Sequence, residues 1–395
     1  MKSPIIFIIS ILFFISACSV EEQVLVVSDC ASNLPSAPDH SLKAPLQAIM
    51  DKYVKRGLPG AVIGIKDQEG YWVGTAGFAQ LETQTRMEPC QVHLGYSVTK
   101  TFTATAVMRL VEQGKMELDR TIQTYLPDKI ANNIPGRDKI TVRQLLNHTS
   151  GLPDFFDMLS WQSDWLSNPS KIRTKEANLE TIYNKSLRFE PGTDWQYSNT
   201  NYLLLAFIIE HVTKQNHAQV LKELVLDRAN LNIYYKIQPA YLEELPLPNF
   251  YSDRFANGNL ENITRAHVNT YGYSDNGSGG IAAAPADFMF FLDALRKGLI
   301  VSGTSLQQMQ QWVKGKHSAD WEYGLGFEYY QYGGGQAELG HGGTGIGGRT
   351  LLLHSPDNDI TFFIATNLGG ETSVQQIILT SEFLNETAEF LCKPR

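Results

Sequence analysis

The stretch Leu94-Gly-Tyr-Ser-Val-Thr-Lys-Thr-Phe-Thr103 decides the fold, because two kinds of local structure are expected to meet in it. The apolar run from Val92 to Tyr96 favours a strand. After it, apolar side chains recur every three or four positions, which is the period of a helix; they are Ala104, Val107, Met108, Leu110 and Val111. Ser97 is therefore expected where a strand or loop enters a helix.

Ser97 and Lys100 have the chemistry of a nucleophile and its base. A serine hydroxyl needs an adjacent base to become a good nucleophile, and Lys100 lies one helical turn later on the same face. Unpaired N–H groups at the helix N-terminus can stabilise a developing oxyanion. A Ser-x-x-Lys tetrad also arises by chance, as a helix cap followed by a surface lysine. Other motifs must therefore decide its meaning.

Composition limits the classes of function. The chain has 395 residues, a formal net charge of −8 at pH 7 and 43% hydrophobic residues. This length allows one large domain or roughly two to three ordinary ones. Nucleic-acid binding requires a clustered positive surface, and the sequence has no basic block. We expect no nucleic-acid partner.

The N-terminus has the features of an export signal. An apolar run from Ile5 to Ile15 is too short to span a bilayer, so residues 1–17 are predicted to be a signal peptide. Ile15-Ser16-Ala17-Cys18 resembles a bacterial lipobox, which implies that Cys18 is lipidated. Ser19 follows it, which favours the outer membrane in a Gram-negative source. Residues 18–41 would then be a lipidated tether on the periplasmic face; a soluble periplasmic or secreted protein is the alternative.

The remaining cysteines allow at most one disulfide. Cys30, Cys90 and Cys392 would share an oxidising compartment, and an odd number leaves one thiol over. The sequence does not select the pair. No C-x-x-C motif occurs, so a zinc or thioredoxin-like site has no support. The serine chemistry proposed above implies neither a metal nor a cofactor.

Residues 42–392 are predicted to form the folded domain. A helix over residues 42–56 and strands over 61–65 and 71–78 open it. Strands over 349–354 and 360–367 and a helix over 373–391 close it. Between them, from about 97 to 320, the patterns are mostly helical, apart from an irregular stretch over 155–188 that we expect to roof the site. The expected fold class is α+β, with an antiparallel sheet flanked by the first and last helices.

A second motif is Tyr197-Ser-Asn199, which follows the turn-forming pair Pro191-Gly192 and precedes an apolar helix. A phenol near cationic groups can have a lowered pKa and can move protons to or from a leaving group. A carboxamide can bond both a lysine and a substrate carbonyl. The same triplet would also serve as a buried aromatic turn with a helix cap.

A third motif is Gly340-His-Gly-Gly-Thr-Gly-Ile-Gly-Gly348. Its G-x-G-x-x-G spacing is not expected to bind a dinucleotide, because the strand-like run of residues 349–353 follows it where a helix is required. A fourth stretch is Ile140-Thr-Val-Arg-Gln-Leu-Leu-Asn-His-Thr-Ser-Gly-Leu-Pro-Asp154, in which Thr141 can cap a short helix. His148 is expected to be structural.

Together, these stretches resemble the serine β-lactamase and penicillin-binding-protein superfamily, in the branch of class C β-lactamases, DD-carboxypeptidases, D-aminopeptidases and esterases. The resemblance covers roughly residues 42 to 392. It implies a β-lactamase/transpeptidase-like fold in which Ser97, Lys100 and Tyr197 are catalytic. It also implies that Asn199, His341, Gly343 and Thr344 bind substrate, and that the N–H groups of Ser97 and Thr344 form the oxyanion hole.

Two departures from the family pattern bear on the substrate. Gly342 replaces the usual threonine of the His-Thr-Gly triplet, which removes a hydroxyl that would hold a substrate carboxylate. Close carboxypeptidase relatives carry an arginine where Glu328 stands, and an acidic residue there would repel a carboxylate if it faced the site. Arg349 could substitute for that arginine.

The expected enzyme is a monomeric serine hydrolase. Its substrate would be a D-amino-acid-containing cell-wall peptide, as in a DD-carboxypeptidase, or a small amide or ester. An esterase or β-lactamase of the same fold is one alternative. A non-catalytic cell-wall-binding lipoprotein is another, although a binding module would gain nothing from an intact nucleophile and base.

Overall fold

A computed structural model describes residue 37 and residues 39–395, except residues 230, 232, 236–244, 275–276, 316–320 and 371–372. The predicted signal peptide, the lipidation site Cys18 and Cys30 lie outside the described residues. Among the helices that are described, none has the length and apolar character needed to cross a bilayer.

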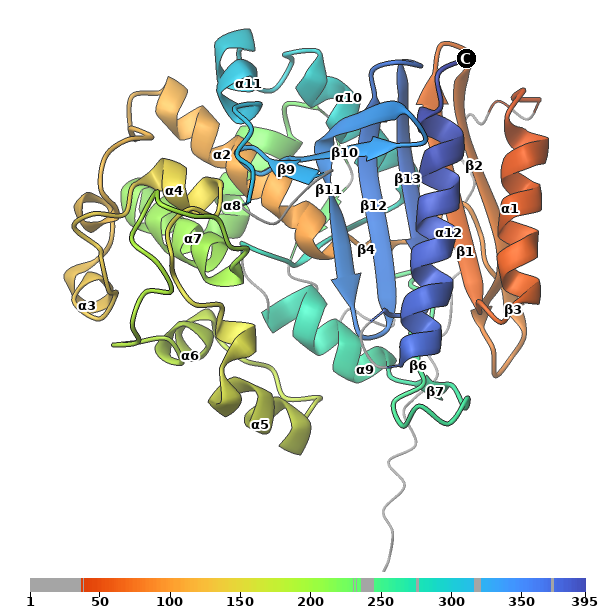
Figure 1. Ribbon diagram of the computed structural model, residues 1–395, viewed down its shortest axis with the longest axis horizontal. Coiled ribbons are helices and arrows are strands. Elements are labelled where there is room, and N and C mark those ends of the chain that lie inside the picture. Colours follow the sequence, from red (N-terminus) through yellow and green to blue (C-terminus); the bar gives the residue numbers. More distant parts are fainter. Residues whose placement is uncertain are drawn as a thin grey trace, which may run out of the picture.

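An eight-stranded antiparallel sheet forms one side of the molecule (Figure 1). The order of its strands is β3-β2-β1-β13-β12-β11-β10-β9. Residues from the two ends of the chain therefore meet in the middle of the sheet, where Ile63 of β1 pairs with Ile364 of β13. The strands are β1 (Gly60–Asp67), β2 (Gly70–Gln80), β3 (Thr85–Arg86), β9 (Trp321–Tyr323), β10 (Glu328–Tyr332), β11 (Gly335–Gly345), β12 (Gly348–Ser355) and β13 (Ile360–Thr366).

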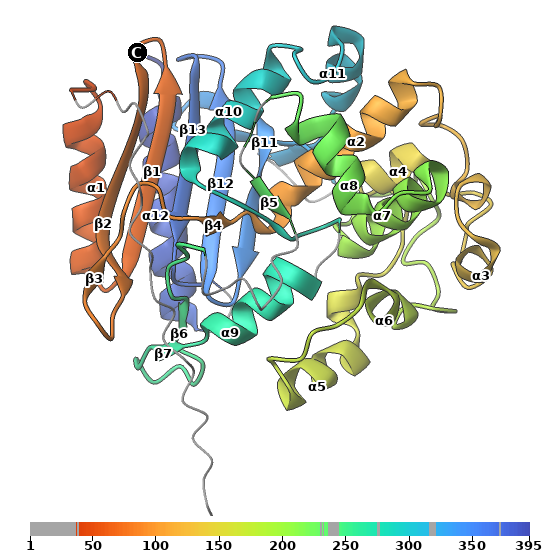
Figure 2. The same cartoon turned by 180° about the vertical axis from the view of Figure 1, so that it is seen from behind.

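The first and last helices cover one face of this sheet. They are α1 (Lys43–Lys55) and α12 (Val374–Cys392), which lie beside each other in Figure 1. Helix α1 buries Leu46, Ile49, Met50 and Tyr53, whose three- and four-residue spacing places them on one side. Helix α10 (Pro285–Arg296) packs on the opposite face, which Figure 2 shows from behind.

The rest of the chain between β3 and β9 is mostly helical and stands beside the sheet. Its helices are α2 (Thr99–Glu112), α3 (Asp128–Ala131), α4 (Val142–Leu146), α5 (Leu159–Ser167), α6 (Lys175–Glu180), α7 (Asn199–Thr213), α8 (His217–Leu221), α9 (Thr264–His267) and α11 (Gly303–Met309). Single turns of 3₁₀ helix are η1 (Tyr96–Val98), η2 (Ile122–Thr124) and η3 (Phe155–Asp157), and π-helical segments are η4 (Lys222–Leu226) and η6 (Val268–Ser274). Short strands are β4 (His93–Leu94), β5 (Ile233–Tyr235), β6 (Tyr251–Ser252), β7 (Glu261–Asn262) and β8 (Ile281–Ala283). The predicted α+β fold is confirmed.

Some predictions of secondary structure in this region are confirmed and others are wrong. Thr141 caps α4 through a capping box with Gln144, as the sequence predicted. The strand expected over residues 92–96 is shorter, because only His93–Leu94 pairs, with β8. The prediction of an irregular stretch over 155–188 is wrong, since η3, α5 and α6 lie in it. Polar and apolar residues of α5 alternate without a clear helical stripe, and this helix buries only Trp161.

The structure shows which described cysteine is disulfide-bonded and which is a free thiol. Cys90 is disulfide-bonded, and Cys392 is a buried free thiol at the end of α12. Cys392 is thus the thiol left over. Burial raises the pKa of its Sγ to about 12, so it stays protonated and behaves as a small apolar side chain.

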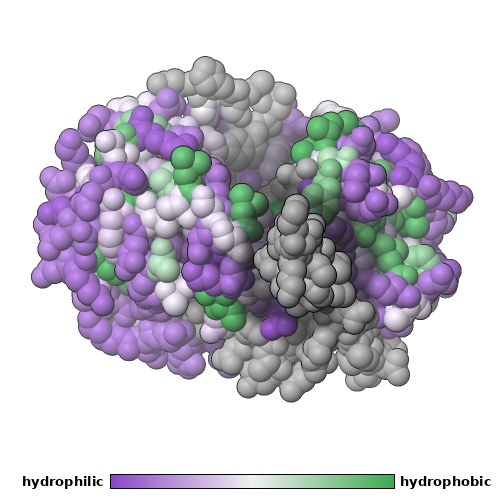
Figure 3. All heavy atoms as spheres, turned by 90° about the horizontal axis from the view of Figure 1, so that it is seen from below, coloured by the Kyte–Doolittle hydropathy of each residue, from purple (hydrophilic) through white to green (hydrophobic). Residues whose placement is uncertain are grey.

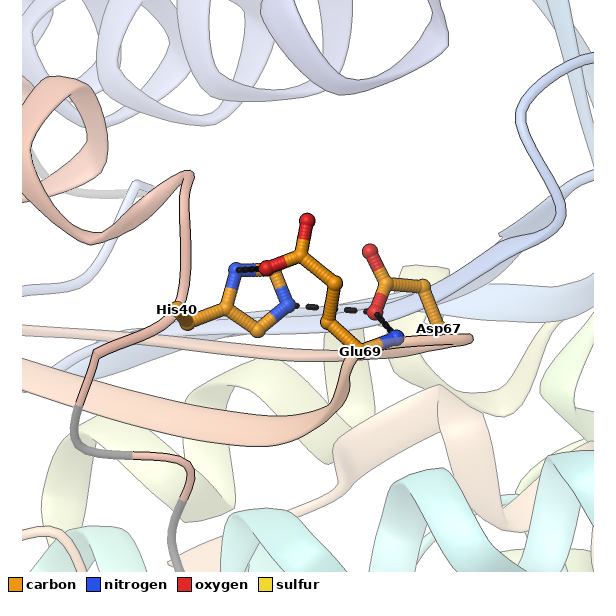
Figure 4. A group of neighbouring side chains, drawn as sticks. All are labelled: His40, Asp67 and Glu69. Atoms are coloured by element: carbon orange, nitrogen blue, oxygen red, sulfur yellow. Dashed lines mark hydrogen bonds and ion pairs between the residues drawn. The ribbon is translucent and has the colours of Figure 1, made fainter.

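His40, Asp67 and Glu69 anchor the start of the domain onto the β1–β2 turn (Figure 4). His40 Nε2 lies 3.1 Å from Asp67 Oδ1, and the Leu42 N–H donates to His40 Nδ1 at 3.2 Å. Glu69 accepts hydrogen bonds from the N–H and O–H of Ser41, at 3.0 and 2.6 Å. Because hydrogen bonds already engage both nitrogens of the imidazole, this group serves to fix the chain rather than to offer an open set of metal ligands.

Candidate active site

Ser97 sits in η1, the single turn that leads into α2. Its predecessor Tyr96 has a φ of +46°, in the left-handed region, which costs a non-glycine residue on the order of 1–3 kcal/mol. Contacts on both sides hold this turn. The Gly95 N–H donates to Ile281 O at 2.7 Å, and the Tyr96 hydroxyl lies 2.8 Å from His267 Nε2. The strained turn places Ser97 at the N-terminus of α2, as the sequence predicted.

Lys100 and Tyr197 both reach the Ser97 hydroxyl. Lys100 Nζ lies 3.0 Å from Ser97 Oγ, and the Tyr197 hydroxyl donates to the same oxygen at 2.8 Å. Lys100 is fully buried. It also donates to Asn199 Oδ1 at 2.7 Å and to Ser278 O at 3.0 Å. The structure therefore brings together four residues that lie up to 102 positions apart in the sequence.

The lowered pKa that nearby cations can give a phenol is not found at Tyr197. Burial raises the pKa of this phenol well above its ordinary value, and the carboxyl groups of Glu328 and Asp154 add to the rise, although the hydrogen bond with Ser97 opposes it. Lys100 Nζ lies 4.9 Å from the centre of the Tyr197 ring, but desolvation outweighs this nearby cation. Tyr197 is thus a neutral phenol that holds its proton toward Ser97.

Asp154 fixes Asn199, a role that was not predicted from the sequence. Its Oδ2 accepts hydrogen bonds from the backbone N–H and the side-chain amide of Asn199, at 2.9 and 2.8 Å. The same amide is thereby oriented with its oxygen toward Lys100. Burial raises the pKa of Asp154, against the effect of these bonds. Nothing in the spacing of residues 154 and 199 signals this contact, because the intervening helices bring the two together.

His148 has a structural place beside this cluster, consistent with the expectation. Its backbone has a φ of +63°, and its Nδ1 accepts hydrogen bonds from Ser198 N at 3.2 Å and Asn201 Nδ2 at 2.9 Å. Burial holds its pKa well below the ordinary value, with Lys100 contributing. A neutral imidazole therefore packs against the Tyr197 ring, with the ring centroids 4.3 Å apart.

The third motif lies on β11, next to the serine turn. A Cβ atom at Gly343 would stand 2.5 Å from Gly95 O and 2.8 Å from Tyr96 Cβ. Only glycine fits there, so β11 can approach η1 closely and bring Thr344 to the cavity beside Ser97. His341, two residues before Gly343, has its Nε2 2.9 Å from the Tyr323 hydroxyl. Burial lowers the pKa of His341 to about 3, so this imidazole is neutral.

Glu328 faces this site and contacts Gly342, the other position at which the sequence differs from the family pattern. Its Oε2 accepts hydrogen bonds from Gly342 N at 2.5 Å and from the Tyr330 hydroxyl at 2.9 Å. Burial raises the pKa of Glu328 to about 7, against the effect of these bonds and of Lys100. Arg349 also lines the cavity, and its Nη1 donates to Ser381 Oγ at 2.6 Å.

These residues line a cavity of about 650 Å³ between the sheet and the helical region. Viewed from below, the surface shows two mainly hydrophilic lobes with a hollow between them (Figure 3). Residues of η3 and α5 form part of the wall, so this segment does border the site as expected. The lining residues of the site motifs and of the walls beside them are Ser97, Asp154, Tyr197, Asn199, Glu328, Tyr330, His341, Gly342, Gly343, Thr344 and Arg349. The lining residues from η3 and α5 are Phe156, Asp157, Trp161, Gln162 and Trp165.

Comparison with known proteins assigns this architecture. The Beta-lactamase family model matches residues 46–381. The chain belongs to the β-lactamase family. It is 25% identical to Penicillin-binding protein 4* of Bacillus subtilis (strain 168) over 346 residues, which are 82% of this chain and 71% of that protein. It is 28% identical to Protein flp of Staphylococcus aureus (strain MW2) over 180 residues, or 45% of this chain, and spans about a third of that relative's length.

Solved structures share this fold across most of the chain. A D-stereospecific amidohydrolase from Streptomyces sp. superimposes with a TM-score of 0.73 at 27% identity, covering 89% of this chain and 99% of that one. The D-amino acid amidase from Ochrobactrum anthropi SV3 gives a TM-score of 0.72 at 22% identity, covering 88% and 99%. The chain is thus a hydrolase or acyl-transferase of the serine β-lactamase and penicillin-binding-protein fold.

Proposed function

We propose that this protein hydrolyses amide or ester bonds of D-amino-acid derivatives through a covalent acyl-enzyme on Ser97. The observation that carries the proposal is the Ser97 Oγ itself, which has Lys100 Nζ and the Tyr197 hydroxyl within 3.0 Å. A hydroxyl held between a base and a proton donor is suited to nucleophilic catalysis. The D-configured substrate is suggested by the amidohydrolase and amidase named above.

In the first step, Ser97 Oγ attacks the substrate carbonyl carbon and Lys100, in its neutral amine form, takes the hydroxyl proton. Lys100 is the better candidate for the base, because the raised pKa of Tyr197 makes its phenolate unfavourable. The carbonyl oxygen becomes an oxyanion that the N–H groups of Ser97 and Thr344 would stabilise. One such donor is typically worth about 10² to 10³ in rate.

In the second step, the intermediate collapses and the leaving group departs with the proton of the Tyr197 hydroxyl. Lys100 restores that proton, since both side chains contact the same Ser97 oxygen. Water then attacks the acyl-enzyme with the same residues in reversed roles, and Ser97 is released. Asn199, held by Asp154, would bond the substrate amide throughout.

The test is hydrolysis of the D and L enantiomers of one amino acid amide, followed by chiral separation of the product. The Ser97→Ala variant is the matched control. Hydrolysis of the D enantiomer by the wild type alone, with an acyl adduct on Ser97 in the intact mass, is the expected result. Equal rates for both enantiomers, or activity that survives in Ser97→Ala, would refute the proposal.

A second candidate is a DD-carboxypeptidase-like enzyme acting on cell-wall peptides, which the similarity to Penicillin-binding protein 4* favours. Exposure to a penicillin separates the candidates. A stable adduct on Ser97 supports a peptidase, whereas hydrolysed drug without an adduct indicates β-lactamase turnover. If the drug stays intact without an adduct and a small activated ester is not hydrolysed either, the alternative of a non-catalytic cell-wall-binding lipoprotein is favoured.

We also propose that the protein is exported and anchored by a lipid on Cys18, acting as a monomer at the periplasmic face. The support is the sequence of residues 1–18, with its short apolar run and terminal cysteine. Labelling cells with a radioactive fatty acid tests the anchor, and Cys18→Ala is its control. Label retained by Cys18→Ala would contradict the proposal.

A further inference from the structure

Glu328 has one carboxylate oxygen engaged and one open to the cavity. Oε2 accepts the hydrogen bonds from Gly342 and Tyr330 and lies 3.5 Å from His341 Nδ1. Oε1 accepts no hydrogen bond from any residue that the structure describes, and Glu328 lines the cavity with a side chain only 8% exposed. An acceptor in so sheltered a place requires a partner, which is either water or a bound molecule.

The position of Glu328 corresponds to the leaving-group side of the reaction. Tyr197, which would protonate the leaving group, lies next to His341, with ring centroids 6.1 Å apart. Glu328 is close enough to Tyr197 to contribute to its raised pKa. Along β11, Gly342 is two residues before Thr344, so both belong to the same face of the strand. A leaving group that departs past Tyr197 would meet the Gly342 and Glu328 side of the cavity.

The charges around Oε1 do not favour an anion there. His341 is neutral because burial lowers its pKa to about 3, and Gly342 offers no hydroxyl. Lys100 is turned toward Ser97, Asn199 and Ser278. Arg349 is on β12 and directs its Nη1 to Ser381 and Thr380 of α12. A carboxylate placed against Glu328 would therefore meet a like charge at short range.

We propose that Glu328 determines leaving-group specificity: its open carboxylate oxygen binds a leaving group that carries a cationic amine or an N–H donor, and repels one that carries a carboxylate. This inference rests on the proposed function and narrows it. The preferred substrates are D-aminoacyl amides whose leaving amine is neutral or positively charged. Peptides that end in a free carboxylate next to the cleaved bond are poor substrates.

This preference should depend on pH. The pKa of Glu328 is raised to about 7, so the carboxyl is mostly neutral at pH 6 and mostly ionised at pH 8. Preference for a cation and rejection of a carboxylate should both strengthen as pH rises through this window. The titratable or charged groups that interact with Glu328 are Lys100 from α2, Tyr197 before α7, Tyr202 on α7, Tyr323 on β9, Tyr330 and Tyr332 on β10, and His341 on β11. Two further charged groups line the same cavity, Arg349 on β12 and Asp154 before η3.

Three D-phenylalanyl substrates of similar size test the inference: the N-(2-aminoethyl)amide, the glycinamide and the glycinate. They carry a cation, a neutral amide and a carboxylate at the same distance from the cleaved bond. We would measure kcat/KM for each at pH 6 and pH 8 with the wild type, Glu328→Gln and Glu338→Gln. Glutamine keeps an acceptor for Gly342 and Tyr330 but removes the charge. Glu338 is on β11 outside the cavity, so its variant is the matched control.

At pH 8, the wild type is expected to prefer the cationic substrate over the glycinate by about 10- to 100-fold, the range of a charge-assisted hydrogen bond. Glu328→Gln should compress this ratio to within about threefold, whereas Glu338→Gln should retain it. The wild-type ratio should shrink at pH 6.

Two results would overturn the inference: a wild-type preference for the glycinate, or a wild-type ranking that persists in Glu328→Gln. If Glu328→Gln lowers Tm but keeps the ranking, Glu328 has only a structural role. If the wild type hydrolyses none of the three, the proposed function has failed and the inference falls with it, an outcome distinct from hydrolysis without discrimination.

Discussion

Replacing Gly343 with alanine should disable the site without unfolding the protein. The added Cβ would stand 2.5 Å from Gly95 O, 2.7 Å from Thr350 Oγ1 and 2.8 Å from Tyr96 Cβ. The first distance is about 0.9 Å short of an ordinary contact of 3.4 Å, and that neighbour is backbone. The φ of Gly343 is not positive, so the effect is steric alone. Strand β11 must therefore move away from the serine turn by close to an ångström.

That displacement sets the size of the effect. Overpacking of this kind typically costs about 1–3 kcal/mol of unfolding free energy, which a domain of this size should survive. The same shift moves Thr344 away from Ser97, and a misplacement of about 1 Å can cost about 10²-fold in rate. We expect Gly343→Ala to acylate at least about 100 times more slowly than the wild type, while its Tm falls by only a few degrees.

The assay is stopped-flow acylation of Ser97 by an activated ester, with Tm measured on the same samples. Gly342→Ala is the matched control, because its Cβ would be 3.4 Å from Glu328 Oε2 and 3.6 Å from Leu351 Cδ1. It should acylate within about threefold of the wild type. If Gly343→Ala acylates normally, or if the two variants lose rate equally, close approach of β11 to Ser97 is not what builds the site.

Three further results are expected. Lys100→Met and Tyr197→Phe should each reduce kcat/KM by about 10² to 10⁴, and the double variant should lose little more, because both residues act on Ser97 Oγ as a unit; additive losses measured by steady-state kinetics would contradict this. Asp154→Asn should cost about 1–3 kcal/mol in urea unfolding, because an amide has one accepting oxygen and cannot serve both Asn199 and the Phe156 N–H, which donates to Asp154 Oδ1 at 3.0 Å, and it should also slow acylation; unchanged acylation would mean that Asn199 is held by other contacts. The pKa of Glu328 is raised from 4.5 to about 7, so the folded state binds the proton more tightly and wild-type stability should fall by up to about 3 kcal/mol as pH rises from 4.5 to 7. Glu328→Gln has no carboxyl group to titrate. Its free energy of unfolding should therefore rise relative to that of the wild type between pH 5 and pH 8. If it falls relative to the wild type or does not change, the raised pKa of Glu328 is refuted.

Local patterns predicted the parts of the site that short stretches of chain determine. The change of period around Ser97 indicated a helix start, and the structure has η1 and α2 there. The apolar runs near both ends of the chain predicted the strands and flanking helices of the sheet. The grouping of Ser97, Lys100, Tyr197 and Asn199 came from the family resemblance, since residues about 100 positions apart carry no sign of contact in a single sequence.

What the sequence could not supply depends on tertiary packing. Nearby cations could have lowered the pKa of Tyr197, but desolvation by the groups packed around its ring, among them His148 and Tyr323, outweighs them. Desolvation is a property of that packed environment and not of the residues next to Tyr197 in the chain. The bond from Asn199 to Asp154 likewise requires α7 to start beside the loop before η3.

Gly342 and Glu328 look like two independent departures in the sequence, but in the structure they are one feature. A Cβ at position 342 would already be 3.4 Å from Glu328 Oε2, so a threonine side chain, which extends beyond Cβ, would compete with the carboxylate for the same space. The glycine also frees its N–H to bind that carboxylate at 2.5 Å. Because the small residue admits the acid and the acid takes up the glycine N–H, a threonine at position 342 alone would crowd the carboxylate, and a side chain without an acceptor at position 328 alone would leave the Gly342 N–H unpaired. The two positions therefore change the chemistry of this wall together, from one suited to an anion to one suited to an N–H donor or a cation.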